Sequence, residues 1–273
     1  MSYFNIKRFA RTAFWMYRIN VKNVLSFAGG LSFGYLFTFI GWLWPLLRSG
    51  AATQETAVRF SSSLNTCTFI YVLLIVFSGT WIFADIKTKG QRIALKMLPA
   101  TDLEKFLVRF IAITLGTSMA GIVAFCIADV LRIAVCLAVG IDYVGFGLAE
   151  FITNIANADN LVTWESGNTS FLTTFVGVQL CVWAHSLYML GSVLLRRYQY
   201  VIVTILLVLV VIGLSWMSSL FPAGGLTPNA DGQHAMLTYT LSAVLAVATV
   251  ADWWLSYKVF SRMQVINNKW INL

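Results

Sequence analysis

Charged side chains are scarce in this sequence: Asp, Glu, Lys and Arg together make up 11% of its 273 residues. Hydrophobic residues make up 59%, and the mean hydropathy is +0.77. The apolar share of soluble domains is only about 45–50%. The composition therefore excludes an ordinary soluble domain and predicts a chain that lies in a lipid bilayer.

Motifs for catalysis and for cofactor binding are missing as well. The sequence has no Gly-x-x-x-x-Gly-Lys-Ser/Thr loop to hold nucleotide phosphates. Its two histidines, His185 and His234, lie on different segments and form no His-Glu-x-x-His zinc motif, and the four cysteines have no paired spacing. We expect no cofactor, and an intramembrane enzyme is a less favoured alternative function.

Six apolar stretches are each long enough to cross a hydrocarbon core about 30 Å thick, which takes about 20 residues of helix. A helix satisfies its own backbone hydrogen bonds in lipid, so the sequence predicts an all-helical, polytopic membrane protein with a single transmembrane domain. The predicted spans are 26–47, 65–84, 106–132, 171–195, 201–220 and 237–257.

The residues before the first span have an amphipathic pattern. In the stretch 1–23, Lys7 and Arg11 fall on one helical face, while Ile6 and Phe9 fall on the opposite face. A basic amphipathic helix of this kind lies in the membrane surface. We therefore expect an interfacial helix at the amino terminus.

The positions of the nineteen Lys and Arg residues indicate the orientation. Most lie before span one, between spans two and three, between spans four and five, or after span six. The other side holds only Arg48, Arg59 and, near a span end, Arg132. Basic loops stay in the cytoplasm, so both termini are predicted to be cytoplasmic in a cell (cytoplasmic or inner) membrane. Basic residues in short loops meet lipid headgroups, and we expect no nucleic-acid partner.

Charge is concentrated in one cytoplasmic segment, residues 85–105, "DIKTKGQRIALKMLPATDLEK". Thr101 and Glu104 have the spacing of a capping box, which predicts that the helix of span three begins there. Pro99 cannot continue an upstream helix and predicts a corner. The basic and apolar stretch before this corner predicts a short amphipathic helix, preceded by the flexible Gly90.

This arrangement, with "MLPATDLEKFLVRF" leading into a span, resembles the coupling segment of type-two ABC exporter permeases. Together with the tail "YKVFSRMQVINNKW" it looks like the permease-like membrane proteins common in Bacteroidetes, although Gln91 stands where the family typically has threonine. The resemblance implies a permease subunit that moves a hydrophobic or amphiphilic substrate outward. It implies a separate cytosolic ATPase that docks on residues 90–105, and a second permease copy or a paired permease.

The resemblance assigns the contact with the ATPase to ten residues of this segment. They are Gly90, Arg92, Leu95, Lys96, Leu98, Pro99, Thr101, Asp102, Glu104 and Lys105. A membrane accessory or scaffold protein without a transport cycle is the alternative that the sequence leaves open.

A few polar residues lie inside the predicted spans. Asp129 and Arg132 are three residues apart on one helical face, and we expect a mutually satisfied pair that anchors the following external segment, in preference to a substrate gate. Gln179 and His185 in span four are candidates to line a cavity. For His185, a hydrogen bond to a neighbouring helix is the favoured interpretation.

The external segment, residues 133–170, is the longest stretch between spans. Its apolar residues are spaced so that they predict an interfacial helix. They are Phe146, Leu148, Phe151, Ile152 and Ile155.

Overall fold

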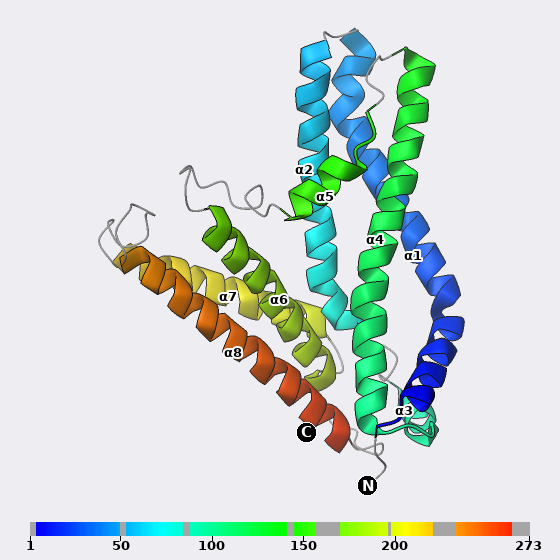
Figure 1. Cartoon of the computed structure of the whole chain (residues 1–273), viewed down its shortest axis with the longest axis vertical. Helices are drawn as coiled ribbons and strands as arrows, with labels where there is room; N and C mark the ends of the chain where they lie inside the picture. Colours follow the sequence, from blue (N-terminus) through cyan, green and yellow to red (C-terminus); the bar gives the residue numbers. More distant parts are fainter. Residues whose placement is uncertain are drawn as a thin grey trace. The chain divides into compact units, whose positions relative to one another are not determined.

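The computed structural model describes residues 4–49, 53–83, 88–140, 145–156, 170–195, 198–220 and 233–263, and these residues are almost entirely helical (Figure 1). The elements are α1 (Ile6–Ser49), α2 (Thr53–Ser78), the 3₁₀ helix η1 (Gly79–Trp81), α3 (Lys89–Met97), α4 (Asp102–Val139), α5 (Leu148–Ala156), α6 (Ser170–Leu194), α7 (Gln199–Leu220) and α8 (Gln233–Arg262).

Five helices in the described part of the chain are long and apolar enough to cross a membrane. The prediction of an all-helical membrane protein is confirmed at this level. The five segments are Ile6–Pro45, Thr56–Trp81, Asp102–Val139, Phe175–Leu194 and Tyr239–Arg262.

The chain divides into two compact units. Unit 1 comprises residues 1–14, 76–114 and 162–273, and unit 2 comprises residues 15–75 and 115–161. Helices α1, α2 and α4 each contribute residues to both units, whereas α3, α6, α7 and α8 belong to unit 1 and α5 belongs to unit 2.

The core of unit 2 is aromatic. Helix α5 lies against α1, α2 and α4 (Figure 1) and inserts Phe151, which is fully buried. The Phe151 ring stacks on that of Phe125 with centroids 3.8 Å apart and 7° between the planes, and Tyr35 packs edge-on against both rings. Such ring pairs add about 0.5–1.5 kcal/mol beyond the area that they bury.

The core of unit 1 forms where α6 and α8 lie side by side and where α3 and the start of α4 meet the end of α8 (Figure 1). Phe106 of α4 packs against Phe83 and Phe260, with centroids 5.8 and 5.9 Å apart. Gly79 in η1 allows a close approach to α6, because a Cβ atom there would lie 2.6 Å from the carbonyl oxygen of His185.

Three predicted segments differ in their bounds from the structure. Span two, predicted as 65–84, corresponds to α2, which begins at Thr53 and ends at Ser78. The expected interfacial helix 1–23 and first span 26–47 form one continuous helix, α1, because no glycine or proline stands between them to break it. Span three, predicted as 106–132, is longer: α4 begins at Asp102 and ends at Val139.

Substitution of Gly79 tests the close packing in unit 1. Gly79→Ala forces a Cβ atom against the α6 backbone, and overpacking of this kind costs about 1–3 kcal/mol. We expect a lower unfolding temperature in lipid nanodiscs. Gly29→Ala is the matched control, since a Cβ atom at this helical position meets nothing within 4 Å. It should leave the unfolding temperature unchanged or raise it, and equal losses in both variants would contradict the packing.

Candidate functional site

The charged segment of the sequence folds into two helices joined at a corner, and we call residues 88–105 the elbow. Its first helix, α3, begins with a capping box: the Thr88 hydroxyl accepts a hydrogen bond from the Gln91 amide at 3.3 Å, and the Gln91 side chain accepts one from the Thr88 amide at 3.1 Å. The helix ends at Met97, because Leu98 precedes a proline and is extended, with φ −61° and ψ 132°.

The second helix of the elbow, α4, begins as the sequence predicts. The Thr101 hydroxyl accepts a hydrogen bond from the Glu104 amide at 3.2 Å, and the Glu104 carboxylate accepts one from the Thr101 amide at 2.8 Å. The predicted capping box is therefore confirmed. The amides of Thr101 and Glu104, which have no partner within the helix, are hydrogen-bonded in this way.

The Glu104 carboxylate also binds the start of α1. Its two oxygens accept hydrogen bonds from Arg8 Nε and Nη2, each at 2.7 Å, and from the Asn5 amide at 2.8 Å. Glu104 is completely buried, whereas the Arg8 side chain is 31% exposed. Bidentate Arg–carboxylate pairs of this kind fix geometry as well as charge. Sequence reasoning missed this pair, because 96 residues separate its members and no local pattern connects them.

Two lysines connect the helices of the elbow across the corner at Pro99. Lys96 Nζ, near the end of α3, lies 3.2 Å from both carboxylate oxygens of Asp102 in the first turn of α4. Lys105 Nζ donates a hydrogen bond back to the Lys96 carbonyl at 3.4 Å. These contacts cross the Pro99 corner, so α3 and the start of α4 are held together.

The predicted coupling residues separate into buried and exposed groups. Arg92, Leu95, Glu104 and Lys105 are buried within unit 1 and hold the elbow in place, so they are not available to a partner. Gly90 is exposed. The sequence predicts it before the short helix, but it lies in the first turn of α3. The other members lie at or near the surface; Pro99 is exposed, and Lys96, Leu98, Thr101 and Asp102 are half-buried.

Three large apolar side chains of the elbow are exposed. Met97 is 80% exposed, Ile93 41% and Leu103 39%. Sequence reasoning did not assign these residues to the site. Ile93 and Met97 are spaced i, i+4 and so lie on one face of α3, a signal that was present in the sequence.

The predicted Asp129–Arg132 pair is confirmed and anchors the segment after α4. Arg132 Nε lies 2.8 Å from Asp129 Oδ1, and Arg132 Nη2 donates to the Gly145 carbonyl at 2.6 Å. The Gly147 amide donates to Asp129 Oδ2 at 2.8 Å. Both side chains are buried, with the Arg132 guanidinium 4.3 Å from the Phe60 ring centroid, so the geometry is that of a structural anchor.

Helix α5 follows this anchor and differs in part from the predicted interfacial helix. Phe151 points into the aromatic core and is fully buried, whereas Phe146 and Ile152 are about half exposed. Residues 157–169 of the external segment, and the tail after Met263, lie outside the described residues.

The predicted polar residues of α6 bind neighbouring helices. His185 Nε2 lies 3.2 Å from the Thr114 hydroxyl of α4, which confirms the favoured interpretation of this histidine. Gln179 donates to the Ser242 carbonyl of α8 at 2.7 Å and accepts from the Ser242 hydroxyl at 2.8 Å. Both residues therefore stabilise contacts between helices.

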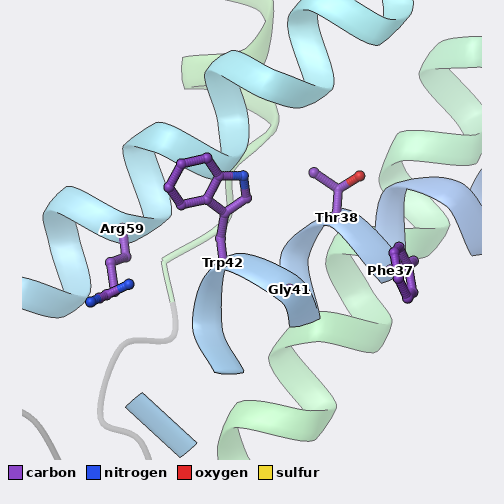
Figure 2. Close-up of a pocket in the computed structure, with 5 residues that line it drawn as sticks. All are labelled: Phe37, Thr38, Gly41, Trp42 and Arg59. Carbon is purple, nitrogen blue, oxygen red and sulfur yellow. The ribbon is translucent and has the colours of Figure 1, made fainter. Parts of the chain in front are cut away.

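A surface hollow lies between α1 and α2 in unit 2 and contains none of the predicted site residues. It is lined by Phe37, Thr38, Gly41, Trp42 and Arg59 (Figure 2). Gly41 carries no side chain to fill it. Within the described ranges, no group of three or more His, Cys, Asp or Glu side chains is placed to hold a metal ion.

Comparison with known proteins gives no relative: no family model, no curated protein and no solved structure matches the chain.

The buried position of Glu104 predicts a larger stabilising role than that of its neighbour Asp102. Glu104→Gln removes a carboxylate that accepts hydrogen bonds from Arg8, Asn5 and Thr101. Asp102→Asn, the matched control on the same helical turn, removes one half-exposed ion pair with Lys96, and exposed pairs contribute about 0–1 kcal/mol. We expect the fall in unfolding temperature to be at least twice as large for Glu104→Gln; a smaller fall than in the control would contradict this assignment.

Proposed function

We propose that the chain is the permease subunit of an exporter driven by a separate cytosolic ATPase, which docks on the exposed face of the elbow. The observation that carries the proposal is that charged side chains of the elbow are buried while large apolar ones are exposed. Glu104 and Arg92 are buried, whereas Ile93 and Met97 are exposed. Exposed apolar patches beside polar residues are typical of protein contact sites.

The ion pairs of the elbow connect it to two long helices, as a coupling element requires. A force on α3 reaches α4 through the Lys96–Asp102 pair, and it reaches α1 through the Arg8–Glu104 pair. Helix α4 has 38 residues and is therefore about 57 Å long at 1.5 Å per residue. In the proposed cycle, α4 carries motion of the elbow into the bilayer as a rigid-body shift.

A sixth span completes the proposed topology. Helix α7 has 22 residues, from Gln199 to Leu220, which is the length that a hydrocarbon core requires. Its aliphatic side chains from Ile202 to Ile212 are mostly exposed, as lipid contact requires. With six spans and basic residues on the elbow side, we propose that both termini lie in the cytoplasm. The family resemblance is the basis for two further proposals. The substrate is hydrophobic or amphiphilic, and the subunit acts as a homodimer or together with a paired permease.

Substitution of Met97 tests the docking face. Met97→Asp puts a charge into the proposed apolar contact, and because Met97 is 80% exposed the fold should be unaffected. We expect the amount of a nucleotide-hydrolysing subunit that copurifies from native membranes to fall at least tenfold, which corresponds to about 1.4 kcal/mol. The readouts are quantitative mass spectrometry and ATP hydrolysis by the purified complex.

The matched control is Lys89→Asp, which places the same carboxylate on another exposed position of α3. It should retain the ATPase subunit. A wild-type chain that purifies without any ATPase subunit, or equal retention in both variants, would contradict docking on this face. A complex that forms but moves no substrate on ATP addition in proteoliposomes would instead identify an accessory protein.

A further inference from the structure

A buried acidic residue, Asp252, lies between α6 and α8 in unit 1. It stands 13 residues after Tyr239 and 10 before Arg262, the ends of the apolar segment of α8, or about 15 Å along the helix from Arg262. The residue is 9% exposed. Ionisable residues inside membrane segments are rare and are candidates for a functional site, and neither the elbow nor the Asp129–Arg132 pair includes this one.

Ser186 lies within hydrogen-bond distance of two oxygen atoms but has a single hydroxyl hydrogen. The Ser186 hydroxyl oxygen lies 2.7 Å from the Trp183 carbonyl oxygen and 3.0 Å from Asp252 Oδ2. A serine hydroxyl has one hydrogen to donate, and a carbonyl oxygen only accepts. When Ser186 donates to the closer Trp183 carbonyl, the contact with Asp252 is a hydrogen bond only if the carboxyl group donates its own proton to Ser186.

The charges around Asp252 favour the same state. The basic groups on the packed elements are His185 of α6, which contacts Thr114, Arg109 of α4, which donates to the Ile82 carbonyl, and Lys258 of α8, which lies over the Trp254 ring. In the described part of the chain, none of them forms an ion pair with Asp252. A carboxylate in an apolar membrane segment without a cation is costly.

The other buried acids show the contrast. Asp129 has Arg132 at 2.7 Å, and Glu104 has Arg8 at 2.7 Å, so each has the cation that stabilises its ionised form. Asp252 has a hydroxyl group as its side-chain partner in place of a guanidinium.

We propose that Asp252 is a proton-binding site within the membrane, in which the neutral carboxyl group donates to Ser186 and Ser186 donates to the Trp183 carbonyl. Loss of the proton removes the hydrogen bond and leaves a charge between two packed helices. The α6–α8 contact therefore depends on proton occupancy at this site. The site rests on the geometry of unit 1 and stands whether or not an ATPase docks on the elbow.

Infrared spectroscopy of the whole chain in lipid vesicles at pH 7 measures the proton directly. We expect a carbonyl stretching band of a protonated carboxyl group that shifts when aspartate is labelled with ¹³C. The band should be lost in Asp252→Asn, which keeps the shape of the side chain. It should persist in the control Asp129→Asn, because Asp129 is paired with Arg132 and not with a hydroxyl group alone.

A second variant keeps the test decisive if Asp252→Asn does not fold. Ser186→Ala removes the hydrogen-bond partner and should move the band to higher wavenumber without abolishing it. The proposal is overturned by the absence of a ¹³C-aspartate band at pH 7, by a band that survives in folded Asp252→Asn, or by a band that Ser186→Ala leaves unshifted.

Discussion

The Glu104 carboxylate is the interaction on which the proposed site depends most. It caps α4 through the Thr101 amide and binds Arg8 and Asn5 from the start of α1. A fully buried carboxylate is tolerated only when cations and donors satisfy it. Because one side chain meets that demand with donors from two distant segments, the start of α1 and the start of α4 are joined at one point.

The same requirement explains most polar contacts between the helices of each unit. In an apolar medium an unpaired polar group is costly, so polar side chains find partners on neighbouring helices. Gln179 and Ser242 exchange two hydrogen bonds, and Asp129 is satisfied by Arg132 and by the Gly147 amide. These residues hold helices in register, and their position inside a span is accounted for without a role in catalysis or transport.

Local patterns could be predicted from the sequence, and distant contacts could not. The Thr101–Glu104 capping box and the Asp129–Arg132 pair each lie within one helical turn, where spacing alone determines which side chains meet. The Arg8–Glu104 contact spans 96 residues and the Ser186–Asp252 contact spans 66, so they depend on how the helices pack. The continuous α1 was missed for another reason: a change in polarity along the sequence was interpreted as a break in the helix.

Burial changes which residues of the elbow have a functional interpretation. A charged cytoplasmic segment in an apolar protein suggests that the charges themselves meet a partner, yet Glu104, Arg92 and Lys105 point inward. The bidentate Arg8–Glu104 pair and the half-exposed Lys96–Asp102 pair hold the elbow in one shape, and a fixed shape is what the proposed coupling role requires. The large apolar side chains that remain exposed on the elbow are Ile93, Met97 and Leu103. Charge in this segment sets the position of the helices. In the proposed complex, apolar area supplies the contact with the ATPase, since burial of apolar surface is the main source of association free energy.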